Sequence, residues 1–247
     1  MVSAMSYSDI IRVKNLGNLF KLKMNPLYQT ISPIVTAGLV LYLNGRDFTN
    51  SPPTTAWIDK SGLGNNAIPS GMAYTTASGS DGSGGVMFDG IDDIATLGVN
   101  TVGDSASFTI ELKFVMTVNS MRTLVSKASG LGAGARMLID VYPASTVRFF
   151  GYNTLDATTG DTVGVSVLAG TLAYGTFIFD GTNFKTYING VLKQTTAGVG
   201  TLKPIVNNFN IGHRFNSAFY NESIKMVKVY NRVLTDLEIT QNYNASR

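Results

Sequence analysis

Hydrophobic and polar residues alternate along much of the chain after residue 38, which is the pattern of β-strands. Between residues 108 and 116 every even position is apolar, whereas Thr109, Glu111 and Lys113 take odd positions. This period of two predicts an antiparallel strand with one buried and one polar face. Shorter runs rich in β-forming residues predict further strands at 124–126, 136–141, 147–152, 162–168, 177–179, 184–188 and 191–194.

Turn and capping signals complete this pattern. Asn189-Gly190 predicts a tight hairpin, because a type I′ turn needs positive φ at both central residues. Thr235 and Glu238 have the spacing of a capping box, with Leu234 and Ile239 at the positions of a hydrophobic staple. We therefore predict that residues 37–247 form an all-β, two-sheet antiparallel jelly-roll sandwich with one short C-terminal helix.

The first 36 residues have a different character, and we interpret them as an arm for docking or oligomerisation. They hold four basic residues against Asp9 alone, so the whole net charge of +3 lies there. Their spacing fits a helix or a strand equally well. So many large apolar side chains should bury against this domain or a partner chain. The residues expected to mediate assembly are Arg12, Lys14, Leu16, Leu19, Phe20, Lys21 and Leu22.

Composition excludes several classes of function. With 19 basic and 16 acidic residues the charge is near balance, which argues against a nucleic-acid partner. The absence of cysteine excludes disulfides, thiolate metal sites and thiol catalysis. No apolar run approaches the ~18 residues of a membrane span, and the first residues lack the apolar core of a secretory signal. We therefore expect neither a membrane partner nor export by the general pathway.

Several segments resemble a known family in order and spacing. They are residues 38–43 (GLVLYL), 57–66 (WIDKSGLGNN), 88–93 (FDGIDD), 187–191 (YINGV) and 229–234 (VYNRVL). Together they resemble laminin-G-like domains of the concanavalin A-like lectin/glucanase superfamily, of the kind found in structural proteins of tailed bacteriophages. The resemblance implies the jelly roll, and it also implies a virion protein that assembles in the host cytoplasm.

Catalysis is not expected from these residues. Some relatives of this fold hydrolyse glucans with paired carboxylates on one strand. This chain has only three glutamates, Glu111, Glu222 and Glu238, and none of them lies in a Glu-x-Asp-x-x-Glu arrangement. His213 is the only histidine, and we expect it to be a polar residue at a strand end. We predict that the protein is not an enzyme.

Two acidic loops are candidate calcium sites, although no cofactor is required by the predicted function. One loop holds Asp59 and Asn65, and the other holds Asp89, Asp92 and Asp93. Calcium takes six to eight oxygen ligands, which loops of a β-sandwich can supply. The alternative is that the aspartates accept hydrogen bonds from turn backbone, with the neighbouring glycines supplying positive φ.

A glycan site needs an aromatic ring exposed in a polar loop, because such rings stack on the apolar face of a sugar. The loop that best fits contains Phe215, Asn216, Phe219, Tyr220 and Asn221. Phe149 and Phe150 have opposite parity on a predicted strand, which would leave one of them facing solvent.

These observations lead to two functional hypotheses. The first is a non-enzymatic virion structural protein, such as a capsid decoration, head fibre or tail component, that oligomerises and contacts other virion proteins through residues 1–36. The alternative is a carbohydrate-binding or adhesion module that recognises host or environmental glycans.

Overall fold

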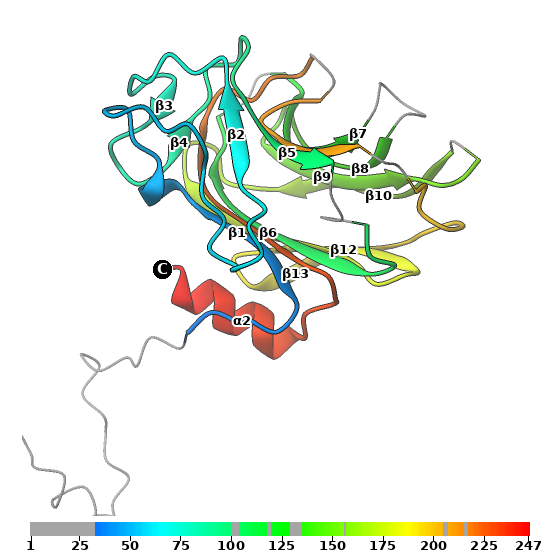
Figure 1. The fold of residues 1–247 in the computed structure, drawn as a ribbon. Helices are drawn as coiled ribbons and strands as arrows, with labels where there is room; N and C mark the ends of the chain where they lie inside the picture. The colour runs from blue at the N-terminus through cyan, green and yellow to red at the C-terminus, as the bar shows by residue number, and fades with distance from the viewer. Residues whose placement is uncertain are drawn as a thin grey trace, which may run out of the picture. The chain divides into compact units, whose positions relative to one another are not determined.

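The computed structural model describes residues 33–99, 104–117, 120–128, 135–155, 157–204, 207–214 and 217–247. Within these ranges two antiparallel β-sheets pack face to face, and an α-helix, α2 (Asp236–Ala245), lies on the outside (Figure 1). This arrangement confirms the predicted sandwich with a C-terminal helix. The helices of the described residues are too short or too polar to cross a bilayer.

The two sheets differ in size and in strand order. The eight-stranded sheet has the order β13 (Val191–Ala197), β12 (Asn183–Ile188), β11 (Leu172–Phe179), β6 (Phe108–Val115), β15 (Ser223–Tyr230), β4 (Val86–Met87), β3 (Gly79–Ser80), with β1 (Leu39–Asn44) also paired to β15. The seven-stranded sheet has the order β10 (Thr158–Ser166), β9 (Thr146–Tyr152), β8 (Ala135–Tyr142), β7 (Arg122–Ala128), β14 (Asn208–Ile211), β5 (Ile94–Val99), β2 (Ala67–Ser70). A short 3-10 turn, Gly45–Asp47, follows β1.

The main core fills the space between the sheets. Trp57, Phe108 and Phe149 are each completely buried there. The indole Nε1 of Trp57 donates a hydrogen bond to the carbonyl oxygen of Asn44 at 2.8 Å, so its one polar atom is satisfied. Burying a large apolar side chain stabilises the fold by about 1.5–3 kcal/mol, which makes this layer the principal source of stability.

Strand β6 follows the predicted alternation but not the predicted exposure. Its odd positions Thr109 and Glu111 are as completely buried as the apolar even ones. The reason is that the chain around α2 covers the outer face of the eight-stranded sheet. Thr109 Oγ1 donates to the carbonyl oxygen of Arg232 at 2.9 Å and accepts from the backbone N–H of Leu234 at 3.1 Å. The prediction of a half-exposed strand was therefore wrong.

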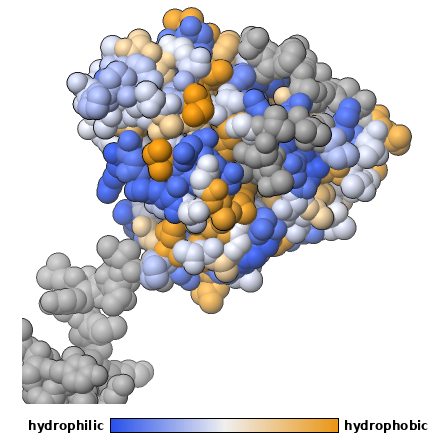
Figure 2. Space-filling view, viewed as in Figure 1, coloured by the Kyte–Doolittle hydropathy of each residue, from blue (hydrophilic) through white to orange (hydrophobic). Residues whose placement is uncertain are grey.

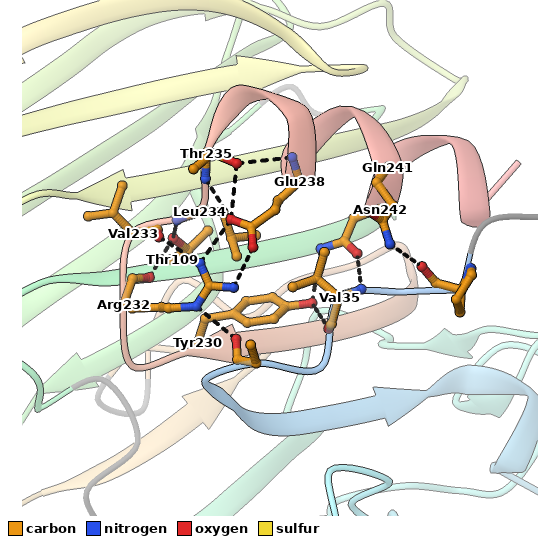
Figure 3. Close-up of polar contacts among 12 residues, drawn as sticks. Val35, Thr109, Tyr230, Arg232, Val233, Leu234, Thr235, Glu238, Gln241 and Asn242 are labelled. Carbon is orange, nitrogen blue, oxygen red and sulfur yellow. Dashed lines mark hydrogen bonds and ion pairs between the residues drawn. The ribbon is translucent and has the colours of Figure 1, made fainter.

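Helix α2 begins as the sequence predicts. Thr235 Oγ1 accepts from the backbone N–H of Glu238, and Glu238 Oε2 accepts from the backbone N–H of Thr235 at 2.9 Å (Figure 3). Arg232 pairs with the same carboxylate through two hydrogen bonds of 2.8 and 2.6 Å. Leu234 and Ile239 share one apolar cluster on the sheet, as the staple pattern predicts.

The described chain begins with a segment held against α2 (Figure 3). The backbone N–H of Val35 donates to Asn242 Oδ1 at 2.8 Å, and its carbonyl oxygen accepts from the Tyr230 hydroxyl at 3.0 Å. Gln241 Nε2 donates to the carbonyl oxygen of Pro33 at 2.6 Å. Residues 33–36 therefore pack on the sandwich, although the sequence pattern places them in the arm. Residues 1–32, with every predicted assembly side chain, lie outside the described residues.

Candidate functional site

The outer face of the seven-stranded sheet carries charged side chains in direct cross-strand register. Thr123 on β7 pairs with Asp140 on β8, and Asp140 pairs with Arg148 on β9. The adjacent pair Ile139 and Phe149 belongs to the core, so alternation directs Asp140 and Arg148 away from it. The sheet thus brings polar groups from three strands together on its outer surface.

Asp140 is the charged centre of this row. Its side chain is completely buried, and Oδ1 accepts a hydrogen bond of 2.7 Å from Thr123 Oγ1. Oδ2 lies 3.5 Å from Arg214 Nη1 and has no hydrogen-bond partner among the described residues. Burial raises the pKa of Asp140 to about 6, against the pull of Thr123 and Arg214. The carboxylate is therefore ionised at neutral pH with one oxygen free to accept a hydrogen bond.

Arg148 is held by its neighbours. Its Nε donates to both carboxylate oxygens of Asp161, at 2.6 and 2.7 Å, and its Nη1 donates to the Tyr142 hydroxyl at 2.9 Å. The guanidinium lies 4.1 Å from the ring centroid of Phe150. Phe150 is only 2% exposed, so the prediction that one of the two adjacent phenylalanines faces solvent was wrong. Stacking and ion pairing fix Arg148 and neutralise Asp161.

A tight turn after β14 brings further groups beside Asp140. The backbone N–H of Arg214 donates to Ser217 O at 3.1 Å, and the N–H of Ser217 donates to Arg214 O at 3.0 Å. The carbonyl oxygen of Ala218 accepts from the backbone N–H of Thr123 at 2.8 Å, which ties the turn to β7. The Arg214 guanidinium is thereby placed at the Asp140 carboxylate.

His213 and Phe219 flank this turn as a stacked pair. Their ring centroids are 5.9 Å apart, with 17° between the planes. His213 is 7% exposed, and neither of its ring nitrogens has a hydrogen-bond partner among the described residues. Burial lowers the pKa of His213, so at neutral pH the ring offers one donor and one acceptor. We call Thr123, Asp140, His213, Arg214 and Phe219 the outer-face site.

The structure divides the glycan-binding residues predicted from the sequence. Phe219 is half-buried within the outer-face site, and Asn221 is half-buried near it in the chain with its Oδ1 unpartnered. Tyr220 is completely buried, and its hydroxyl donates to the carbonyl oxygen of Val115, so its prediction as a sugar-contacting residue was wrong. Phe215 and Asn216 lie outside the described residues.

Sequence reasoning missed Asp140, Thr123 and Arg214 as members of a site, and it expected no special role for His213. The available signal was Asp140 itself, because an acidic residue inside a strongly apolar strand is rarely buried without a partner. Its contact with Arg214 joins residues 74 positions apart, which no local pattern reveals.

The first predicted calcium loop uses its oxygens internally. Asp59 Oδ1 accepts from the backbone N–H groups of Tyr42 and Ser61, at 2.8 and 2.9 Å. Its Oδ2 accepts from Ser61 Oγ at 2.7 Å and from the N–H of Asn65 at 2.9 Å. Asn65 Nδ2 donates to Val40 O at 2.7 Å. Four hydrogen bonds use both carboxylate oxygens, so Asp59 organises a turn and does not fit a metal ligand.

The second predicted calcium loop brings its carboxylates together. One oxygen each from Asp89, Asp92 and Asp93 lies within 4.8 Å of the others. The buried Asp93 already accepts from Ser78 Oγ at 2.9 Å and from the backbone N–H of Asp89 at 2.8 Å. Burial, with repulsion from Asp89 and Asp92, raises the pKa of Asp93. Three carboxylates are fewer than the ligands calcium takes, and both oxygens of Asp93 already accept hydrogen bonds, which favours the alternative interpretation of a hydrogen-bonded turn.

Comparison with known proteins agrees with the architecture. Residues 88–240 match the model of the family described as the concanavalin A-like lectin/glucanases superfamily. No curated protein matches the sequence. Trypanosoma rangeli sialidase in complex with sialic acid is similar in structure, with 16% identity and a TM-score of 0.63 over 88% of this chain and 36% of that chain. The receptor binding domain of botulinum neurotoxin C/D mosaic serotype is similar at 13% identity and a TM-score of 0.62, over 85% of this chain and 51% of that chain.

The chain thus spans between about a third and a half of these two solved structures. At such low identity the likeness establishes the fold alone. The family match is the stronger finding, because it extends over most of both sheets and into α2. The chain belongs to the concanavalin A-like lectin/glucanase superfamily.

Proposed function

We propose that the protein is a carbohydrate-binding module and that the glycan binds at the outer-face site. One observation carries this proposal. Asp140 Oδ2 and both ring nitrogens of His213 are buried and have no hydrogen-bond partner among the described residues, and His213 stacks on the half-buried ring of Phe219. Unpartnered buried polar atoms are rare because each costs about 1–3 kcal/mol, so their concentration in one place favours a ligand that satisfies them.

The chemistry of a sugar matches these groups. When the partly exposed Arg214 side chain moves aside and opens the enclosed carboxylate, a sugar hydroxyl can donate to Asp140 Oδ2 and accept from the Arg214 guanidinium, which lie 3.5 Å apart without ligand. The neutral His213 ring can pair with a second hydroxyl as donor or acceptor. Phe219 supplies an apolar surface for the C–H face of the ring. Family membership favours a lectin-like role over other small polar ligands.

We further propose that binding occurs without hydrolysis. Glu111 lies beneath α2 on the opposite sheet, and Glu238 is engaged by Arg232 and by the helix cap. Near Asp140, the acidic neighbour Asp161 is held by Arg148. No second free carboxylate is therefore poised beside Asp140 among the described residues, as acid–base cleavage would require. Release of reducing ends from any polysaccharide, lost on Asp140→Asn, would contradict this proposal.

A panel of immobilised neutral and acidic polysaccharides tests the binding proposal. For a polysaccharide that the full chain binds, we expect Asp140→Asn to weaken binding about 10- to 150-fold, the loss of a hydrogen bond to a charged group. Phe219→Ala should weaken binding about three- to tenfold through the lost ring contact. Calorimetry or surface binding would measure both effects.

Asp236→Asn is the matched control, because Asp236 lies on α2 at the opposite sheet and pairs with the Tyr187 hydroxyl at 2.8 Å. It should leave the affinity unchanged. Absence of binding to every polysaccharide of the panel would contradict the proposal. Binding that both site variants retain would show that the glycan contacts another surface.

The virion role predicted from the sequence is a second and more specific proposal. It rests on the resemblance to bacteriophage proteins and on residues 1–32. Glycan binding is compatible with it, since a decoration or fibre protein can also adhere to a host surface. Light scattering of the full chain and of a chain starting at Pro33 tests its assembly component. An oligomer that becomes a monomer on removing residues 1–32 would support it, whereas two monomers would contradict homo-oligomerisation through these residues.

A further inference from the structure

Three reactive side chains are enclosed between α2 and the eight-stranded sheet, on the side opposite the outer-face site. Lys228 on β15 and Glu111 on β6 are direct cross-strand partners. Asn242 reaches them from α2. All three are completely buried, and no part of the proposed glycan binding uses them.

One carboxylate oxygen connects the amine with the amide. Glu111 Oε2 accepts a hydrogen bond of 2.9 Å from Asn242 Nδ2 and lies 3.6 Å from Lys228 Nζ. The side chains of Lys228 and Asn242 therefore meet at the same atom. A carboxylate in this place can receive a proton from the amine and deliver it to the amide nitrogen.

The surroundings favour the neutral forms of both ionisable groups. Burial raises the pKa of Glu111 and lowers that of Lys228, while their mutual attraction opposes each shift. Lys228 Nζ lies 5.5 and 5.9 Å from the ring centroids of Tyr42 and Tyr174. Proton transfer from Lys228 to Glu111 removes two buried charges and leaves a nucleophilic amine.

The Asn242 amide is held by polar partners at both ends (Figure 3). Its Oδ1 accepts from the backbone N–H of Val35 at 2.8 Å, and its Nδ2 also donates to the Tyr230 hydroxyl at 2.9 Å. The Val35 N–H can stabilise negative charge that develops on Oδ1 when Cγ is attacked. The Nδ2 atom, as the leaving group, lies against the carboxyl group that would protonate it.

We propose that Lys228 and Asn242 form an intramolecular isopeptide bond. The Nζ lone pair attacks Asn242 Cγ to give a tetrahedral intermediate whose oxygen faces the Val35 N–H. Glu111, protonated by the first transfer from Lys228, gives that proton to Nδ2 and takes the second proton that Nζ loses as the amide forms. The Cγ–Nδ2 bond then breaks and ammonia leaves, so that an Nζ–Cγ amide replaces the side-chain amide. The reaction needs no oxidant or cofactor, and Glu111 ends in the protonated form that the first proton transfer from Lys228 produced.

The bond would join β15 to α2 covalently and close the chain between residues 228 and 242. It would also hold Pro33 and Val35, because both form hydrogen bonds with side chains of α2. For a protein that adheres to surfaces, such a link resists peeling of the terminal helix from the sheet.

The intact mass of the denatured full chain is the first test. We expect it to be about 17 Da below the mass of the sequence, the ammonia lost per bond. Trypsin cleaves after an unmodified Lys228 but not after an acylated one. The digest should therefore contain Met226–Arg232 joined to Val233–Arg247 as one branched peptide.

Peptide mapping separates this bond from other losses of ammonia. Succinimide formation at Asn189-Gly190 would also remove ammonia, but it would leave residues 226–247 unlinked. A full sequence mass, or a loss that maps anywhere other than Lys228 and Asn242, would overturn the proposal. The wild-type protein alone decides between these outcomes.

Variants then test the role of Glu111. Glu111→Gln keeps the size of the side chain but cannot relay a proton, so the variant should have its full sequence mass and unlinked peptides. Asn244→Ala on the exposed side of the same helix is the matched control and should keep the branched peptide. A branched peptide that persists in Glu111→Gln would contradict the proposed proton relay.

Discussion

Replacing Asp140 with asparagine is expected to stabilise the protein at neutral pH while it weakens glycan binding. The carboxylate is completely buried, and its Oδ2 lacks a hydrogen-bond partner among the described residues. Asparagine has nearly the same shape and can still accept the hydrogen bond from Thr123 Oγ1. The substitution therefore removes a buried charge without opening a cavity.

The size of the effect follows from the raised pKa. The pKa of Asp140 is about 6 in the folded protein, against 3.8 for an unperturbed aspartate carboxyl group. The folded state therefore holds the proton more tightly, and the stability that this proton confers is present below pH 3.8 and lost as pH rises through 6. At 1.36 kcal/mol per pKa unit, ionised Asp140 costs about 3 kcal/mol at pH 7 and about 0.5 kcal/mol at pH 4.

Urea unfolding followed by tryptophan fluorescence measures this difference. Trp57 is the only tryptophan and is completely buried, so its emission reports unfolding of the core. The free energy of unfolding of Asp140→Asn should exceed that of the wild type by up to about 3 kcal/mol at pH 7, and the gain should shrink toward pH 4. A gain independent of pH, or a loss of stability at pH 7, would refute the reasoning.

Three further predictions concern the helix, the domain start and the acidic loop. Thr235→Ala removes the cap of α2 and should lower the free energy of unfolding by about 1 kcal/mol in the same urea assay. A chain starting at Pro33 should match the full chain in melting temperature, whereas one starting at Ala37 should melt lower, because it lacks the buried side chain and two hydrogen bonds of Val35. Because both carboxylate oxygens of Asp93 already accept hydrogen bonds, we expect EDTA to leave the melting temperature unchanged, and a rise with added calcium would contradict this expectation.

Local patterns predicted those elements whose causes are local. The alternation in residues 108–116 defines β6, and the capping box at Thr235 defines the start of α2, because backbone conformation and capping depend on neighbours within a few positions. The aspartates predicted to bind calcium show the limit of such patterns. Asp59 has the residue type of a metal ligand, but its partners are the backbone groups of its own loop and of Tyr42.

Exposure was decided by tertiary structure alone. Thr109 and Glu111 of β6 are buried because α2 and the segment just before it, more than 120 residues later, cover them. Tyr220 and Phe219 are adjacent in the same loop, yet the first enters the core and the second stacks on His213. No local signal distinguishes two neighbouring aromatic residues in a turn, because burial depends on what the rest of the chain places against each one.

The sequence by itself determined that residues after 37 form a β-sandwich with one C-terminal helix, because periodicity and turn chemistry act over short distances. Only the tertiary structure placed Arg214 at Asp140 and Asn242 at Glu111. These contacts depend on strand order and on the docking of α2. Both are determined by many weak interactions between distant parts of the chain. Both proposed sites consequently lie where segments distant in sequence meet.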